Sequence, residues 1–144
     1  TRSSAASDVY KRQKYIYSSL RNKEKNIKNF LLDQNFVSGI GNIYANEILF
    51  LSKIRPTQKG ATLNEKDCKN IAKNSQKVLR DAIDKGGSSI RDFKNTLGKK
   101  GNFQKKFNVY GRNGLNCKRL RCQGTIKKKV ISNRSTFYCS TCQK

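Results

Sequence analysis

The chain has 144 residues, with 32 Lys and Arg against 9 Asp and Glu and no His, so its formal net charge is +23 and its pI is about 10.2. This composition excludes histidine as a catalytic group or metal ligand, and nine scattered carboxylates do not favour a carboxylate-rich metal site. No apolar run of about 18 residues is present, so we expect no transmembrane helix. A charge of this size favours a polyanionic partner. DNA or RNA ranks above an anionic membrane, because no strongly amphipathic basic helix stands out.

The first residues do not look native. Residues 3–13 resemble the in-frame translation of a sequencing adapter, and such segments are set aside before the fold is considered. The alternative is a native disordered tail. Residues 1–13 hold three basic side chains and one acidic side chain, so the charge argument holds without them.

Apolar spacing predicts three helices. Residues 23–34 carry Ile27, Phe30 and Leu31 at helical spacing, and residues 43–52 form a second helix that Pro56 prevents from continuing. Asn64, followed by Asp67, is a typical helix start, and it opens the longest apolar stripe. Gly86 and Gly87 end that helix, and a short helix through Phe93 follows.

Beyond Thr96 the helical periodicity is lost. Residues 97–106 form a Gly/Lys-rich loop, and residues 107–110, 129–131 and 136–138 have the composition of β-strands. From Phe93 to Lys144 there are 14 Lys and Arg and no Asp or Glu. A β segment of this size is too small to bury an adequate core alone, so it needs a cross-link or a metal.

Four cysteines can supply that link: Cys117, Cys122, Cys139 and Cys142. Two close pairs separated by a hairpin-length segment are typical of one structural Zn²⁺ held by four thiolates, a closed site that activates no water. Two disulfides are the competing interpretation, but nothing else indicates secretion. A redox C-x2-C would be expected near a βαβ unit, which is absent. Cys68 lies on the apolar helical stripe, and we expect it to be a buried structural thiol.

The sequence Ser38-Gly39-Ile40-Gly41-Asn42 separates the first two predicted helices. Its glycines allow a tight turn and leave no Cβ between the backbone and a ligand. The following helix presents free N–H groups and the positive end of its dipole there, which suits a phosphate that the Asn42 amide can also contact. A plain helix–helix turn remains the alternative.

A longer stretch around this turn, residues 31–47, resembles the helix-two-turn-helix of bacterial formamidopyrimidine-DNA glycosylases. Further matching motifs follow in order: Ile54-Arg55-Pro56, residues 86–93, Val109-Tyr110-Gly111-Arg112 and residues 133–139. The resemblance covers essentially the whole chain after residue 14. It implies a mainly α fold with a small β zinc module, in which a helix-two-turn-helix lobe precedes a zinc-bound β-hairpin. The expected divisions are a non-native tail (1–13), the helix-two-turn-helix domain (14–94), a basic loop on the lesion side (95–106) and a zinc-finger hairpin (107–144).

The resemblance also implies a function. The family excises oxidised purines such as 8-oxoguanine and formamidopyrimidines from DNA and then cleaves the abasic strand. Its nucleophile is the amine of an N-terminal proline in a β domain, whereas the single proline here is Pro56. We therefore expect the C-terminal, DNA-holding half of such an enzyme. It would bind damaged double-stranded DNA as a monomer without catalysis, in the bacterial cytoplasm near the nucleoid and without a membrane.

By the same resemblance, Lys28, Gly41, Asn42, Tyr110 and Arg134 are the expected DNA-contacting residues. The family assigns the arginine matching Arg134 as the acid of the second elimination, although a guanidinium suits a phosphate better than proton transfer. The family usually has proline after the lysine, where this chain has Asn29. Residues 97–106 correspond to the segment that closes over the extruded base.

Two features depart from simple expectation. The first cysteine pair is spaced C-x4-C instead of the family's C-x2-C, so either residues 118–121 form a bulge beside the metal or the ligand geometry is altered. Lys127, Lys128 and Lys129 form either a solvated hairpin face or a set of phosphate contacts.

The alternative function for the whole chain is a stand-alone, non-enzymatic zinc-containing nucleic-acid module, ribosomal or chromatin-associated.

Overall fold

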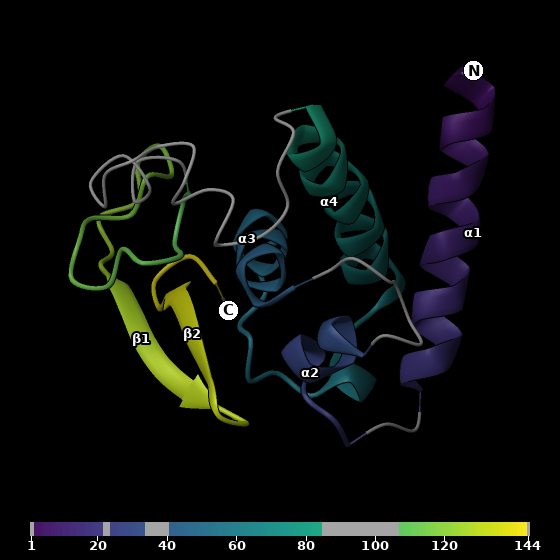
Figure 1. Ribbon diagram of the computed structural model, residues 1–144. Helices are drawn as coiled ribbons and strands as arrows, with labels where there is room; N and C mark the ends of the chain where they lie inside the picture. Colours follow the sequence, from purple (N-terminus) through teal and green to yellow (C-terminus); the bar gives the residue numbers. More distant parts are fainter. Residues whose placement is uncertain (1, 22–23, 34–40, 85–106, 144) are drawn as a thin grey trace.

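A computed structural model describes residues 2–21, 24–33, 41–84 and 107–143. Their elements are α1 (Arg2–Leu20), α2 (Ile27–Leu32), α3 (Asn42–Leu51), a 3-10 turn η1 (Gly60–Thr62), α4 (Glu65–Asp84), β1 (Ile126–Ile131) and β2 (Arg134–Cys139). The β-hairpin, α3, α4 and α1 follow one another across the molecule, with α2 beside α3 (Figure 1). The expected fold class, mainly α with a small β module, is confirmed.

The N-terminal helix α1 crosses residue 13 without a break. This helix packs along α4 and buries its Ile16 and Leu20 side chains fully. Its Gln13 side-chain amide also donates to the Glu65 carbonyl at 3.3 Å. Residue 13 therefore does not coincide with an element boundary, and the division of the chain at this residue stays a prediction. The adapter origin of residues 3–13 is a different matter; helix formation does not test it, and it stays a prediction.

The short helix α2 starts later than its apolar spacing predicts. Asn26 adopts an extended backbone conformation, and its side-chain oxygen accepts the backbone N–H of Asn29 at 2.8 Å, so the helix begins at Ile27 instead of Lys23. Helix α3 agrees with expectation to within one residue at each end, and it lies between α4 and the hairpin.

The long helix α4 begins with a reciprocal cap. The Asp67 N–H donates to the Asn64 side chain at 2.8 Å, and the Asn64 N–H donates to the Asp67 carboxylate at 3.3 Å. The apolar stripe predicted along this helix is buried against α1 and α3 at Cys68, Ile71 and Ala72. Burial raises the pKa of the Cys68 thiol to about 11, as expected of a structural cysteine. No helix in the described ranges is both long enough and apolar enough to cross a membrane.

The hairpin pairs β1 with β2 from Ile126 opposite Cys139 to Ile131 opposite Arg134. Its two-residue turn, Ser132 and Asn133, has φ values of 50° and 64°, the left-handed pair that a tight hairpin requires. Residues 107–110 were expected to be a strand, and this is wrong. They form a turn because their N–H groups bond to a helix side chain, described below, instead of to a neighbouring strand. The expected short helix through Phe93 and the loop at 97–106 lie outside the described residues.

Candidate zinc finger and DNA-contact site

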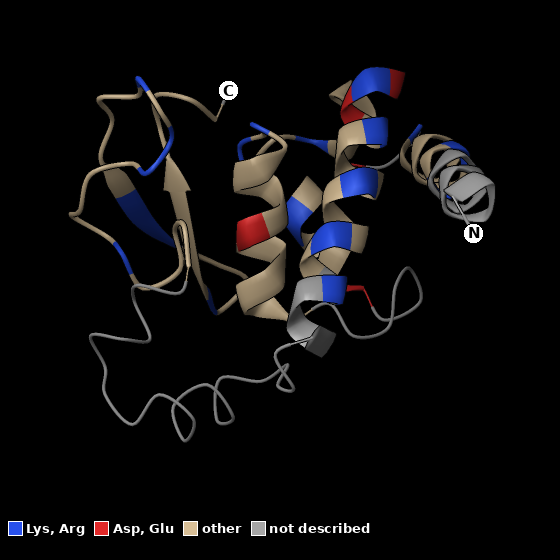
Figure 2. Cartoon of the chain, turned by 90° about the horizontal axis from the view of Figure 1, so that it is seen from above, with Lys and Arg blue, Asp and Glu red and all other residues tan. Residues whose placement is uncertain are grey.

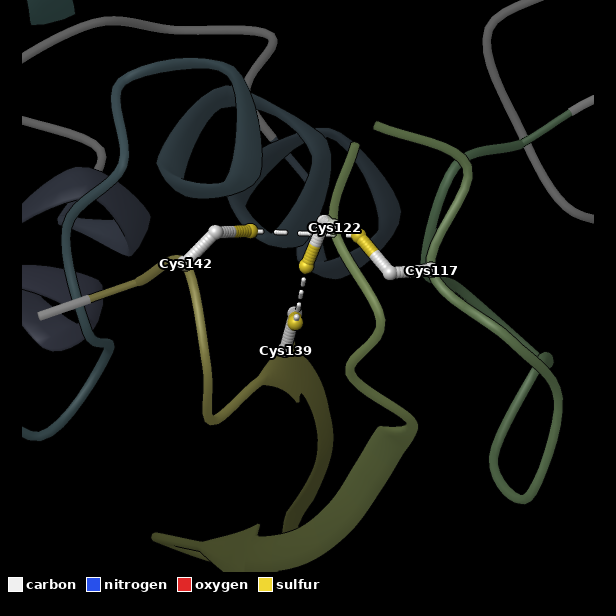
Figure 3. A group of neighbouring side chains, drawn as sticks. All are labelled: Cys117, Cys122, Cys139 and Cys142. Atoms are coloured by element: carbon white, nitrogen blue, oxygen red, sulfur yellow. Dashed lines mark hydrogen bonds between the residues drawn. The ribbon is translucent and has the colours of Figure 1, made fainter. Parts of the chain in front are cut away.

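The four predicted ligands come together at the base of the hairpin, where their sulfur atoms all lie within 4.8 Å of one another (Figure 3). The Sγ atoms of Cys117 and Cys142 are 3.8 Å apart, and those of Cys122 and Cys139 are 3.6 Å apart. Tetrahedral Zn²⁺ with Zn–S bonds of about 2.3 Å separates its sulfurs by about 3.8 Å, so the cluster fits the ion. All four are free thiols, so the disulfide alternative is not what the chain adopts.

Backbone groups around the cluster favour thiolates. The N–H of Arg119 points at Cys117 Sγ and the N–H of Gly124 at Cys122 Sγ, each at 3.4 Å. Burial raises the pKa of Cys117 and of Cys142, whereas at Cys139 backbone N–H groups outweigh burial and bring the pKa to about 7. A Cβ at Gly124 would lie 2.7 Å from Cys139 Sγ, so the close approach requires glycine. The chain therefore carries one structural zinc site, closed by four protein ligands.

The long C-x4-C spacing is absorbed by a turn beside the metal. Cys122 N–H donates to the Arg119 carbonyl at 3.1 Å, Arg121 has φ 68°, and Leu120 at the tip is 86% exposed. Arg119 holds the base of this turn, since its guanidinium donates to the Phe50 carbonyl and lies 4.3 Å from the Phe50 ring centre. The bulge is thus the correct alternative of the two, and the sulfur geometry is preserved.

The end of the chain ties the zinc site to the helical lobe. The fully buried Gln143 side chain accepts from the Cys139 N–H at 2.7 Å and donates to the Ile54 carbonyl at 2.9 Å. Arg55 donates to the carbonyls of Ser140 and Gln143 at 2.9 and 3.3 Å. These contacts join the α3–α4 connection to the residues that flank Cys139 and Cys142.

A buried carboxylate on α3 holds residues 108–110. Glu47, only 5% exposed, accepts the backbone N–H groups of Asn108, Val109 and Tyr110 at 2.8 to 3.1 Å, together with the Asn108 side-chain amide at 3.1 Å. Four donors satisfy a buried carboxylate, and the turn they impose replaces the expected strand. Glu47 in this way places the Tyr110 ring, which packs edge-on against Phe107 and Phe137.

A second cluster centres on the backbone carbonyl of Ser135, at the start of β2. Three side chains donate to this oxygen: Lys28 from α2 at 3.1 Å, and Asn42 and Asn46 from α3 at 3.0 and 3.5 Å. Asn46 is fully buried and its oxygen also accepts the Phe137 N–H at 3.0 Å, so it fixes β2 against α3. We call this set the Ser135 cluster.

Lys28 is an unusual member of the Ser135 cluster, because its side chain is fully buried. Its ammonium donates to the Ser135 carbonyl at 3.1 Å and to the Thr136 hydroxyl at 2.5 Å. Burial, and secondly the nearby positive charge of Arg134, lower the Lys28 pKa from 10.5 to about 8. Arg134 itself is exposed at the end of the hairpin turn.

The lowered pKa of Lys28 predicts a pH dependence of stability. Between pH 8 and 10.5 the folded chain has released this proton and the unfolded chain has not, so the free energy of unfolding rises with pH there, by on the order of 3 kcal/mol in total. Lys28→Met removes the ionisable group and is expected to abolish this rise. Urea unfolding at pH 7.5 to 10.5 measures it, with the exposed Lys25→Met as the control; parallel curves for all three proteins would contradict the burial of a charged Lys28.

Tyr110 and Gly41 complete the set of predicted DNA-contacting residues. The Tyr110 hydroxyl is hydrogen-bonded to the Asn42 side chain, and burial raises the pKa of Tyr110. Gly41 caps α3 with φ −93°, a value open to any residue, and no described atom lies within 4 Å of the place where its Cβ would be. The fold therefore does not require glycine at 41 for its conformation, and no described residue other than its chain neighbours occupies the space beside it.

Structure thus brings Lys28, Asn42, Tyr110 and Arg134 into one region, with Gly41 next to Asn42. Lys127, Lys128 and Lys129 are exposed on β1, which leaves both interpretations of them open. Glu47, Asn46 and Gln143 were missed by the sequence reasoning, although a glutamate and an asparagine on the apolar side of α3 were a signal of buried polar contacts.

Together these parts define a class of protein, a helix-two-turn-helix domain joined to a four-cysteine zinc finger. The model of the formamidopyrimidine-DNA glycosylase H2TH domain matches residues 5–94, and that of the zinc finger found in FPG and IleRS matches residues 114–144. The chain belongs to the formamidopyrimidine-DNA glycosylase family. The first match includes most of residues 3–13.

Several relatives are close in sequence. The formamidopyrimidine-DNA glycosylase of Rickettsia bellii is 45% identical over 138 residues, which cover 96% of this chain and 50% of that protein. The enzyme of Roseobacter denitrificans is 43% identical over 132 residues, or 92% of this chain and 47% of that protein. The chain spans about half the length of these relatives.

Solved structures agree with this assignment. The complex of Lactococcus lactis Fpg with DNA containing an abasic site has a TM-score of 0.77 and 37% sequence identity, and it covers 92% of this chain and 47% of that one. Its complex with DNA containing FAPY-dG matches with the same scores, and MutM bound to carbocyclic 8-oxo-G DNA matches with a TM-score of 0.77 and 36% identity.

Proposed function

We propose that this chain is the DNA-holding C-terminal part of a formamidopyrimidine-DNA glycosylase and abasic-site lyase, which removes oxidised purines from damaged DNA. Support comes from the relatives' names and from solved relatives bound to abasic and damaged DNA. The observation that carries the proposal is the Ser135 cluster, in which two predicted phosphate contacts, Lys28 of α2 and Asn42 of α3, meet at the start of β2 beside Arg134.

The Ser135 cluster has a hydrogen-bond donor that could leave the Ser135 carbonyl and bind a phosphate instead. A carbonyl oxygen has two lone pairs, yet Ser135 O has three donors around it, so one donor can leave without leaving the carbonyl unpaired. Asn42 is the member at the start of α3, where the helix dipole and free N–H groups already favour an anion. In the described part of the chain, its Oδ1 is a buried side-chain oxygen without a partner. Rotation of this amide would let Tyr110 donate to Oδ1 and turn the Asn42 NH2 group toward the phosphate.

Arg134 supplies the exposed charge of the site. Its guanidinium can bind a phosphate through two parallel hydrogen bonds, and a bound phosphate would also offset its repulsion of Lys28. The resemblance assigns it as the acid of the second elimination as well. We give the phosphate role precedence, because a guanidinium does not release its proton readily.

Catalysis is assigned to the half of the relatives that this chain does not span. By resemblance the nucleophile is an N-terminal proline amine, and Pro56 lies inside the chain with its nitrogen in a peptide bond. The chain alone is therefore proposed to bind DNA as a monomer and to excise nothing, with a cytoplasmic, nucleoid-associated setting for the whole enzyme.

Equilibrium binding to a duplex with a single abasic site tests the proposal. With roughly five phosphates contacted, log K is expected to fall against log[salt] with a slope of about −4 to −5, and the abasic duplex should bind more tightly than an intact one. No strand cleavage should accompany binding. A flat salt dependence, or equal affinity for the two duplexes, would contradict the proposal.

A further inference from the structure

Helix α4 carries a row of positive charge that the Ser135 cluster does not use. Five exposed cations recur at intervals of three and four residues and so lie on one helix face: Lys66, Lys69, Lys73, Lys77 and Arg80. We call this row the α4 stripe. Figure 2 shows basic residues following one another along this helix from its first turn onward.

The charged residues of α4 from Lys69 to Arg80 are all positive. No Asp or Glu occurs between Cys68 and Arg80, and the ion pairs found among described residues, Lys25–Asp33 and Lys59–Glu24, do not involve the stripe. Surface helices gain stability from opposite charges four residues apart, whereas like charges at that spacing, as at 69, 73 and 77, destabilise by about 0.2–0.5 kcal/mol each. Opposite charges four residues apart occur at both ends of the stripe, at Glu65/Lys69, Lys77/Asp81 and Arg80/Asp84, so helix stability can account for the ends but not for the run of like charges at 69, 73 and 77.

The opposite face of α4 is not free. Cys68, Ile71 and Ala72 are fully buried against α1 and α3. The expectation that the chain has no strongly amphipathic basic helix is therefore wrong. Because the apolar face is occupied by the core, however, α4 cannot insert it into a lipid surface. A partner must contact the cations alone, as the backbone of a nucleic acid does.

We propose that the α4 stripe binds the sugar–phosphate backbone of a second segment of duplex DNA, separate from the one held at the Ser135 cluster. The stripe spans about 21 Å of helix, enough to follow several phosphates. Helix α3 lies between α4 and β2, so the two surfaces are separated by a layer of the protein. A duplex stays straight over distances far larger than this chain, with a persistence length of about 150 bp, so one short duplex does not reach both.

This inference rests on the proposed function in one respect, that DNA is the partner. Its consequence is a protein that holds undamaged DNA on one surface while the other engages a lesion. The second contact is independent of sequence and of damage, since no base edge is reached from a row of lysines on a helix surface.

The test compares Lys69→Gln/Lys73→Gln/Lys77→Gln with the wild-type chain in binding an intact duplex of about 12 base pairs. Glutamine keeps the helix propensity of lysine, and circular dichroism verifies the fold of each variant. Wild type is expected to bind two duplexes per chain by calorimetry. The variant should bind one, with the second affinity lowered at least tenfold and the magnitude of the salt slope smaller by about 2 to 3.

Two controls separate position from charge. Lys69→Arg/Lys73→Arg/Lys77→Arg keeps the charge and should keep both duplexes, and Lys11→Gln/Lys53→Gln/Lys59→Gln removes the same charge from exposed positions elsewhere and should also keep both. An equal loss in the second control, or one duplex bound by wild type, overturns the inference. Stripe-dependent flotation with phosphatidylglycerol vesicles and unchanged DNA stoichiometry would overturn it in favour of a membrane.

The outcomes also separate this inference from the proposed function. If wild type prefers the abasic duplex and the α4 variant matches it in stoichiometry and salt slope, only the second surface is refuted. If wild type binds no DNA at all, both fail.

Discussion

Removal of zinc is expected to unfold residues 107–143 while the helical lobe keeps its structure. Structural zinc contributes on the order of 10–16 kcal/mol to the folding of small thiolate sites, and the hairpin has few apolar contacts besides Ile126, Phe137 and Val109 to replace it. The lobe has its own core, built by α1 to α4. Treatment with a high-affinity chelator should therefore abolish amide-exchange protection in β1 and β2 and leave most of the helical circular dichroism.

Two cysteine variants sharpen this prediction. Cys142→Ser removes a zinc ligand, so the hairpin of this variant should lose its amide-exchange protection even when no chelator is added. Cys68→Ala alters the buried thiol that lies outside the zinc cluster, so the hairpin should stay protected until metal is withdrawn. Hairpin protection that survives in metal-free protein would refute a structural zinc.

The next largest effect is expected at Glu47. In Glu47→Gln one carboxylate oxygen becomes an NH2 group that faces N–H donors, so about two of the four hydrogen bonds are lost and their donors stay buried. With bonds to a charged acceptor contributing about 1.5–3 kcal/mol each, we expect the free energy of unfolding to fall by about 3 kcal/mol or more.

Urea unfolding measures this loss, and hydrogen exchange locates it. Exchange should accelerate at the amides of Asn108, Val109 and Tyr110 before it does in β1 and β2. Glu24→Gln is the matched control, because Glu24 is exposed and its ion pair with Lys59 contributes little. If Glu47→Gln costs no more than Glu24→Gln, the carboxylate does not hold the turn.

Much of this architecture was predictable where a local signal is strong. Residues close in sequence form the Asn64/Asp67 cap and the apolar face of α4, and a metal with strict ligand spacing explains the four cysteines. The turn at 107–110 was mispredicted because its β-like composition is overridden by Glu47, some 60 residues away. When a side chain distant in sequence accepts the backbone N–H groups of a segment, the sequence of that segment does not indicate the turn that results.

The candidate site shows the same division. Lys28 and Asn42 were found through the resemblance, but their convergence on the Ser135 carbonyl depends on the docking of β2 against α3 through Asn46. Burial of Lys28 was not predictable either, because a lysine before a turn is ordinarily solvated. The zinc finger therefore also positions β2, the strand on which the proposed phosphate contacts from α2 and α3 meet.

The central claim, that the Ser135 cluster and the neighbouring Arg134 bind the DNA backbone at an abasic site, is tested most directly by one comparison. Binding constants of wild type, Asn42→Ala and Arg134→Ala are measured for an abasic duplex and for an intact duplex of the same sequence. The account predicts that each substitution weakens binding to the abasic duplex several-fold more than to the intact one. Equal losses on the two duplexes would show that these residues are general contacts and would contradict the claim.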